Sequence, residues 1–201
     1  MYKHLYDRFS NWYRDGGNIW LYSDPHFSDA ESYEFRGLLT GSTTIDKLDC
    51  DQIKSINTKV GKNDTLIILG DIGNIEKVAE LRGYKVLIKG NHDTGSTNYK
   101  DYFDEVYEGP LYINDRLILS HENLSPLRPY EFNIHGHVHG PNDKMYDTDQ
   151  SKNVCAEHIN YTPISLITFL KQGGLSKTPT VHRVYIDARN EEKKKNKNED
   201  R

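Results

Sequence analysis

Polar residues of the kinds that bind metal ions follow five of the apolar runs in this chain. The run 86–88 leads into Gly90-Asn91-His92-Asp93, and the run 65–69 leads into Gly70-Asp71. Three further segments have the same arrangement: Asp24-Pro25-His26, His121, and Gly136-His137-Val138-His139. Short apolar runs are typical of buried strands, and the ligand sites of α/β domains lie at strand ends. The pattern therefore predicts an α/β domain with a binding site at the ends of its strands.

The order of the apolar segments favours a sheet covered on both faces in the first half of the chain. Strands alternate with helices there, an order typical of a mainly parallel sheet. The predicted strands are 19–22, 65–69 and 84–88, and the predicted helices are 45–60 and 74–82. Beyond residue 103, four short strands are predicted with little room for helices between them, at 105–107, 111–113, 117–119 and 132–134. We therefore expect the second half to be rich in hairpins.

The N-terminus and one long connection carry less regular patterns. An amphipathic helical extension is predicted within residues 1–17, where packing on the domain is favoured over a dimer contact or a lid. Residues 27–44 show no sustained period, so we expect an irregular rim or lid at the substrate entrance. A helix near 165–171 and a strand at 181–186 are expected to complete the domain.

Composition narrows the compartment and the partners. The 201 residues are enough for one core, so we expect a single domain, 1–189, and a disordered charged tail, 190–201. A net charge of -4 lacks the basic excess of a protein that binds nucleic acid without sequence preference. No apolar run approaches the ~20 residues of a membrane span. Cys50 and Cys155 have no CxxC spacing, which favours reduced thiols. We expect a cytoplasmic protein with no membrane partner.

The donor types restrict the metal chemistry. Aspartate, asparagine and histidine without thiolates suit Mn, Fe, Zn or Ni better than they suit a structural zinc site. A pair of metals needs a bridging carboxylate, terminal ligands on each side and space for a shared water. Seven candidates on five segments fit a pair better than a single ion: Asp24, His26, Asp71, Asn91, His121, His137 and His139. We expect two divalent cations, with Mn as the first choice.

In this order, the five segments resemble the calcineurin-like metallophosphoesterases, in particular their small single-domain bacterial and phage members. The resemblance spans residues 19–139, and the later segment 160–166 looks like the one that closes the domain in small members. It implies an α/β (α+β) fold, a four-layer αββα sandwich with a dinuclear site at the strand ends. By position, one metal would be held by Asp24, His26 and His139, the other by Asn91, His121 and His137, and Asp71 would bridge them.

The resemblance also implies a reaction. A hydroxide shared by the two metals would attack phosphorus in line and cleave a phosphodiester, or alternatively a phosphomonoester, of a small nucleotide-like substrate. His92 would lie outside the ligand set, near the scissile phosphate, where it would stabilise developing charge or protonate the leaving oxygen, and Asp93 would orient its ring. The rival interpretation is a catalytically silent protein of the same fold that acts as a binding or scaffold surface. No expected ligand is missing from the sequence, and this favours the enzyme.

Some positions depart from the family pattern or fall outside it. Asn74 stands where many members carry an aspartate, and 27–29 lacks a glycine that is common there, so the entrance geometry and the substrate preference stay open. Arg128, Arg36 and Tyr33 are candidate substrate contacts, each with an ordinary surface or packing role as the alternative. The oligomeric state is open as well.

Overall fold

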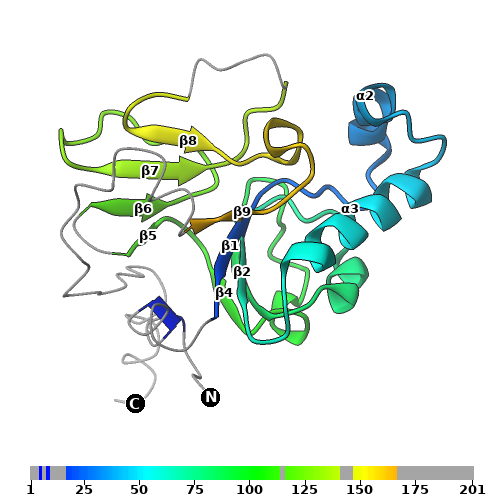
Figure 1. Ribbon diagram of the computed structural model, residues 1–201, viewed down its shortest axis with the longest axis horizontal. Coiled ribbons are helices and arrows are strands. Elements are labelled where there is room, and N and C mark those ends of the chain that lie inside the picture. The colour runs from blue at the N-terminus through cyan, green and yellow to red at the C-terminus, as the bar shows by residue number, and fades with distance from the viewer. Residues whose placement is uncertain (1–4, 6–7, 10–16, 114–115, 141–146, 167–201) are drawn as a thin grey trace.

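Two β-sheets form the centre of the molecule. The structure is a computed structural model that describes residues 5, 8–9, 17–113, 116–140 and 147–166. Apolar side chains from both sheets belong to one hydrophobic core. The helices α2 and α3 lie beside the first sheet, on the side away from the second (Figure 1). The described residues therefore form a mixed α/β fold, as the order of the apolar segments predicts.

The first sheet has the strand order β4-β3-β2-β1-β9. Strands β1 to β4 pair in parallel, and β9 pairs antiparallel with β1 at the edge. β2 is buried along its whole length, as expected for a continuous apolar run covered on both faces. The bounds are β1 Ile19–Tyr22, β2 Thr65–Ile68, β3 Tyr84–Ile88, β4 Glu105–Tyr107 and β9 Ile164–Ser165. β1, β2 and β3 confirm the three strands predicted for the first half, β4 confirms the strand predicted at 105–107, and β9 was not predicted.

The second sheet has the strand order β5-β6-β7-β8. Its strands are β5 Leu111–Tyr112, β6 Leu117–Leu119, β7 Phe132–His135 and β8 Ser151–Asn153. The expectation of a hairpin-rich half is wrong, because β6 and β7 pair in parallel and so do β7 and β8; β5 and β6 are antiparallel. Parallel neighbours need a connection that returns to the starting end, and the segments 120–131 and 136–150 are long enough for this.

Two α-helices follow β1. The expected helix at 45–60 is α3, Ile45–Lys59, and the side chain of Thr44 caps it by accepting a hydrogen bond from the Lys47 amide. The expectation of an irregular rim at 27–44 is wrong for 30–40, where α2 spans Ala30–Thr40. Its N-cap is Asp29, whose carboxylate accepts hydrogen bonds from two amides of the first turn. The periodicity was hidden because α2 leaves two of its leucines exposed.

The remaining described elements are short. The helix expected at 74–82 is a 3₁₀ segment, η1 Ile75–Glu80; two others are η2 Tyr99–Asp101 and η3 Ala156–Ile159. None of the described helices is long and apolar enough to cross a membrane. Within the described residues the long helices flank the first sheet alone, so the four-layer αββα sandwich stays a prediction.

Several predictions concern residues outside the described part. The strand at 181–186, the tail 190–201 and most of the helix at 165–171 lie outside it. Of the N-terminal extension 1–17, the described Leu5 and Phe9 are buried in the core.

Candidate metal centre

The parallel strands bring the candidate ligands to the same edge of the structure. Asp24 and His26 follow β1, Asp71 follows β2, and Asn91 follows β3, so all four leave the carboxyl ends of neighbouring parallel strands. In the second sheet, His121 follows β6, and His137 and His139 follow β7. Side chains that are more than a hundred residues apart in sequence thereby meet at one place.

The backbone is strained where these ligands leave the strands. Asp24, His26, Asp71 and His137 all have φ between 44° and 66°, in the left-handed region that non-glycine residues rarely adopt. The segment Asp24-Pro25-His26 is therefore a turn and not an extended continuation of β1. Such strain costs on the order of 1–3 kcal/mol for each residue and clusters at functional sites. The amides of Asp24 and His26 hold the turn by donating to the carbonyls of Gly70 and Asp71.

Each of the two central carboxylates has one oxygen fixed by a backbone amide and one oxygen facing the other candidate ligands. Asp24 Oδ2 accepts a hydrogen bond of 2.9 Å from the His137 amide, and Asp24 Oδ1 is buried without a hydrogen-bond partner among the described residues. Asp71 Oδ1 accepts 2.9 Å from the His92 amide, and its Oδ2 lies 3.3 Å from His121 Nε2 and 3.7 Å from His26 Nε2. This is the arrangement that a bound cation needs, with lone pairs directed into a shared space.

The histidines are oriented in a matching way. His26 Nδ1 lies 2.9 Å from the carboxylate of Asp29, and His121 Nδ1 lies 2.7 Å from the carbonyl oxygen of Leu69. With Nδ1 hydrogen-bonded to an acceptor, each ring presents its Nε2 lone pair to the centre. His26 Nε2 is buried and has no hydrogen-bond partner in the described part of the chain. Metal-binding histidines in proteins commonly show this orientation.

Three groups of candidate ligand atoms occur among the described residues, and two of them share Asp71. One group is Asp24, His26 and Asp71, and the other is Asp71, His121 and His137; within each group the atoms lie within 4.8 Å of one another. The amide oxygen of Asn91 extends the second group, 2.8 Å from His121 Nε2 and 3.0 Å from His137 Nδ1. The shared carboxylate is where a bridging ligand between two cations would be.

The electrostatics of the second group favour positive charge. Burial lowers the pKa of His121, but the hydrogen bond to Asp71 and the charges of Asp24 and Asp71 outweigh it and raise the pKa to about 9. Burial raises the pKa of Asp71, but the hydrogen bond and the charge of His121 lower it by more. The net pKa of Asp71 lies below its ordinary value. Carboxylates that hold a proton on a buried imidazole would also stabilise a divalent cation, so the donor set fits the metal pair.

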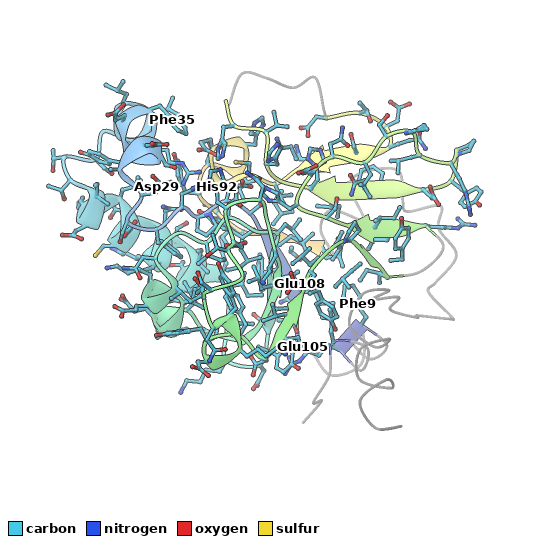
Figure 2. All side chains as sticks on the ribbon, turned by 180° about the vertical axis from the view of Figure 1, so that it is seen from behind. Phe9, Asp29, Phe35, His92, Glu105 and Glu108 are labelled. Atoms are coloured by element: carbon cyan, nitrogen blue, oxygen red, sulfur yellow. The ribbon has the colours of Figure 1, made fainter. Side chains whose placement is uncertain are left out.

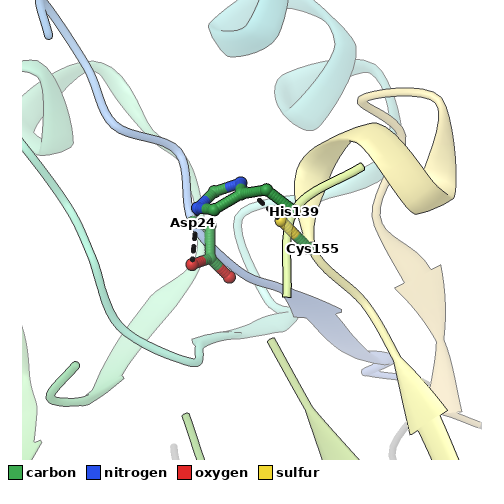
Figure 3. A group of neighbouring side chains, drawn as sticks. All are labelled: Asp24, His139 and Cys155. Atoms are coloured by element: carbon green, nitrogen blue, oxygen red, sulfur yellow. Dashed lines mark hydrogen bonds and ion pairs between the residues drawn. The ribbon is translucent and has the colours of Figure 1, made fainter. Parts of the chain in front are cut away.

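His139 forms the third candidate group together with Asp24 and Cys155. Its Nε2 is 3.7 Å from Asp24 Oδ1, and its Nδ1 is 3.3 Å from Cys155 Sγ (Figure 3). Nδ1 also lies 3.2 Å from Glu157 Oε1. Burial raises the pKa of Glu157, yet His139 and Arg36 together lower it well below its usual range, so the carboxylate is ionised. We did not single out Glu157 from the sequence, because no local pattern marks it.

Two glycines allow the strand ends to approach this closely. A Cβ on Gly90 would lie 2.2 Å from Asp71 Oδ1, and a Cβ on Gly136 would lie 2.2 Å from Asp24 Oδ2. Any side chain at either position would therefore displace one of the two central carboxylates. This explains the glycine at the start of the Gly90-Asn91-His92-Asp93 segment and of the Gly136-His137-Val138-His139 segment.

His92 lies beside His26 of the first ligand group. It is exposed, and its ring centroid is 5.5 Å from that of His26. Figure 2 shows it at the same end of the molecule as Asp29 and Phe35, away from Phe9. An exposed imidazole outside the candidate ligand groups therefore lies next to the first of them.

Asp93 occupies a different position from the expected one. Its carboxylate accepts hydrogen bonds from the amides of Asp71, Ile72 and Gly90, rather than from the His92 ring that we expected it to orient. The hydroxyl of Tyr99 donates to it as well. Asp93 thus ties the loop after β3 to the loop after β2, and the correction follows from backbone amides that the sequence pattern does not show.

The three candidate substrate contacts have different surroundings. Arg36 is completely buried in an ion pair with Glu157, so the structure places it behind the centre and corrects the expectation that it meets substrate. Tyr33 is half-buried, and its hydroxyl donates to the carbonyl of Ser42. Arg128 is exposed, and its guanidinium lies 3.1 Å from the hydroxyl of Tyr130. For Tyr33 and Arg128 a substrate contact stays a prediction.

Comparisons with known proteins find relatives of this chain at low sequence identity. No protein-family model matches it. The uncharacterized protein MJ1445 of Methanocaldococcus jannaschii is 29% identical over 170 residues, which cover 76% of this chain and 89% of that protein. The Gene 66 protein of Mycobacterium phage L5 is 35% identical over 85 residues, which cover 38% of this chain and 40% of the phage protein.

Two solved structures resemble this chain to different degrees. A protein of unknown function from Aquifex aeolicus, AQ665, superposes with a TM-score of 0.59 and 25% identity, over 77% of this chain and 98% of that one. The two chains share a fold over most of their length. The nuclease MPE of Pseudomonas putida superposes with a TM-score of 0.40 and 22% identity over 60% of each chain, a similarity too low to support an argument.

Proposed function

We propose that this protein is a metal-dependent phosphoester hydrolase that cleaves a phosphodiester bond in a small, nucleotide-like substrate. The observation that carries the proposal is the pair of ligand groups that share Asp71. Two atoms of the first group, Asp24 Oδ1 and His26 Nε2, are buried without a hydrogen-bond partner in the described structure. Leaving buried polar atoms unpaired is costly, so their arrangement favours a bound ion as the missing partner.

The described residues would divide between two cations. Asp24, His26 and His139 would hold one, and Asn91, His121 and His137 would hold the other, with Asp71 between them. Oxygen and imidazole donors of this kind suit Mn, with Fe, Zn or Ni as alternatives. When bound, the cations would supply Lewis acidity to the phosphate and lower the pKa of a shared water.

The chain itself would contribute charge, orientation and a proton. Two carboxylates against two divalent cations leave the site positive, and the neutral Asn91 and imidazoles do not cancel that charge, so an anionic phosphate is attracted. His92 is exposed beside His26, where its imidazole would donate a proton to the leaving oxygen. Asp93 would keep Asp71 in place through the Asp71 amide.

Hydrolysis of bis-p-nitrophenyl phosphate tests the proposal. The purified protein is stripped of metal, loaded with Mn, Ni, Zn or Fe, and compared with the Asp71→Asn variant. We expect metal-dependent release of p-nitrophenolate that the variant loses by at least ~10²-fold, because both cations lose a shared ligand. Asp49→Asn is the matched control, since Asp49 is a buried carboxylate that contacts Ser28 rather than a candidate ligand.

The monoester p-nitrophenyl phosphate, assayed in parallel, decides between the two ester classes. Faster hydrolysis of the diester supports the proposed class, and faster hydrolysis of the monoester replaces it. No hydrolysis of either ester with all four metals would contradict an enzyme and favour a binding role.

A further inference from the structure

A completely buried arginine lies directly behind the first ligand group. Arg36, on α2, has none of its surface exposed. Its guanidinium donates 2.7 Å to the Asp24 carbonyl, 2.8 Å to the Pro25 carbonyl, and through Nε to Glu157. One side chain thus joins three segments: the strained turn after β1, helix α2, and η3. Arginine suits this place, because its planar fork offers several donors in fixed directions.

Glu157 connects Arg36 to the candidate ligand His139. Its carboxylate is buried, and both of its oxygens are engaged within the protein. Oε1 faces Arg36 Nε and, at 3.2 Å, His139 Nδ1, while Oε2 accepts from the Cys155 thiol at 2.8 Å. With both oxygens so engaged, Glu157 belongs to none of the candidate ligand groups among the described residues.

The orientation of His139 follows from this contact. A carboxylate oxygen 3.2 Å from Nδ1 favours the tautomer with the proton on Nδ1, which leaves the Nε2 lone pair free. Nε2 lies 3.7 Å from Asp24 Oδ1, the buried oxygen that has no hydrogen-bond partner in the described part of the chain. Two lone pairs therefore converge on one place, and His139 would otherwise be free to turn, because a third of its side chain is exposed.

We propose that Glu157, held by Arg36, is a positioning residue that fixes the ring and the tautomer of His139 for one of the two cations. The inference rests on the metal centre of the proposed function and assigns roles to two residues outside the ligand set. His26 has a corresponding partner in Asp29, and His121 has one in the Leu69 carbonyl. Arg36 differs from these partners because it also donates to the Asp24 carbonyl. Two of the proposed ligands of the same cation, Asp24 and His139, therefore depend on it.

Titration of the stripped protein with Mn²⁺ by calorimetry tests the inference without relying on catalysis. For Glu157→Gln we expect one of two binding events to weaken ~10–100-fold, the usual effect of removing such a partner, while the other keeps its affinity. Asp49→Asn repeats the carboxylate-to-amide change at another buried residue and should leave both events unchanged. Equal weakening of both events in Glu157→Gln, or no weakening, would overturn the inference.

A second variant covers the case in which Glu157→Gln does not fold. Removing only one member of a buried ion pair leaves an unpaired charge, whereas Arg36→Met combined with Glu157→Gln removes both charges together. The double variant lacks the carboxylate as well, so it should show the same selective loss of one Mn²⁺ event. Two normal events in a folded double variant would reject the role of Glu157.

The outcomes separate this inference from the proposed function. A wild-type protein that binds two Mn²⁺ without hydrolysing any ester would contradict the enzyme, and the selective loss in Glu157→Gln would still support the positioning role. Hydrolysis by a Glu157→Gln variant with unchanged binding would contradict the positioning role alone. A wild-type protein that binds no divalent cation would overturn both.

Discussion

The backbone amide of Asp71 donates a 2.8 Å hydrogen bond to the carboxylate of Asp93, 22 residues later in the chain. The same carboxylate accepts from the amides of Ile72 and Gly90. Asp71 is the candidate ligand that two of the groups share, and its φ of 55° has to be maintained against strain. The loop after β3 thus supports the conformation of the loop after β2, and this relationship leads to the first prediction.

Asp93→Ala should destabilise the fold and weaken metal binding together. Three backbone donors would lose their acceptor, and each buried donor left unsatisfied costs about 1–3 kcal/mol. Urea unfolding and Mn²⁺ calorimetry measure the two effects. A double-mutant cycle with His92→Ala separates this role from orientation of the His92 ring. If Asp93 acts through the backbone, its effect stays the same in the His92→Ala background; disappearance of the effect would restore the role we first expected.

His92→Ala should keep both metals and lose turnover. The His92 side chain is exposed and belongs to none of the candidate ligand groups, so metal affinity should not change. Loss of a general acid typically lowers kcat ~10²–10⁴-fold. The loss should be larger for a diester with an alkyl alcohol as leaving group than for bis-p-nitrophenyl phosphate, because p-nitrophenolate needs little protonation. Equal losses for the two esters would argue against proton donation.

Gly136→Ala should displace the Asp24 carboxylate and weaken metal binding. The added Cβ would lie 2.2 Å from Asp24 Oδ2 and 1.9 Å from Ser23 Oγ, so the Asp24 carboxylate has to move. Overpacking of this kind costs about 1–3 kcal/mol, and we expect at least ~10-fold weaker Mn²⁺ binding. Gly95→Ala is the matched control, because nothing lies within 4 Å of a Cβ at that position. Normal Mn²⁺ affinity in Gly136→Ala would show that the Asp24 carboxylate does not contribute.

Asp49→Asn should become more stable, relative to the wild type, as pH rises. Burial raises the pKa of Asp49 above its ordinary value, although hydrogen bonds from Ser28 oppose the shift. A carboxyl whose pKa is raised in the folded state is easier to ionise in the unfolded chain. The wild type therefore loses folding free energy as pH rises from about 4 through the folded pKa, and the Asn variant does not. Urea unfolding of both proteins between pH 3 and pH 7 measures the difference. A constant difference would mean that Asp49 ionises normally.

Phe35→Ala should weaken binding of substrates with an aromatic leaving group. The ring of Phe35 is 37% exposed and packs edge-on against His139, with 5.8 Å between the centroids. A contact between aromatic rings contributes about 0.5–1.5 kcal/mol, so KM for bis-p-nitrophenyl phosphate should rise ~2–10-fold with little change in kcat. Leu38→Ala, at an 87% exposed position of the same helix, serves as control. An unchanged KM would remove Phe35 from the substrate entrance.

The first sheet and the identity of the candidate ligands could be predicted from local sequence. Apolar runs at 19–22, 66–69 and 86–88 made β1, β2 and β3 recognisable, because the part of a strand that is buried on both faces needs apolar residues. The polar residues after those runs marked the strand ends. Helix α2 escaped prediction, since its exposed Leu38 and Leu39 break the one-sided pattern on which recognition of a surface helix depends.

Local sequence thus determined which side chains stand at the ends of the strands, whereas tertiary structure alone decided how they meet and what holds them. The parallel pairing of β6, β7 and β8 depends on how long connections return, which a single sequence does not record. Arg36 and Glu157 are 121 residues apart, and Asp93 acts through backbone amides that are the same for every residue type. Hydrogen bonds over such separations are specified by the folded arrangement, because each partner by itself looks like an ordinary charged residue.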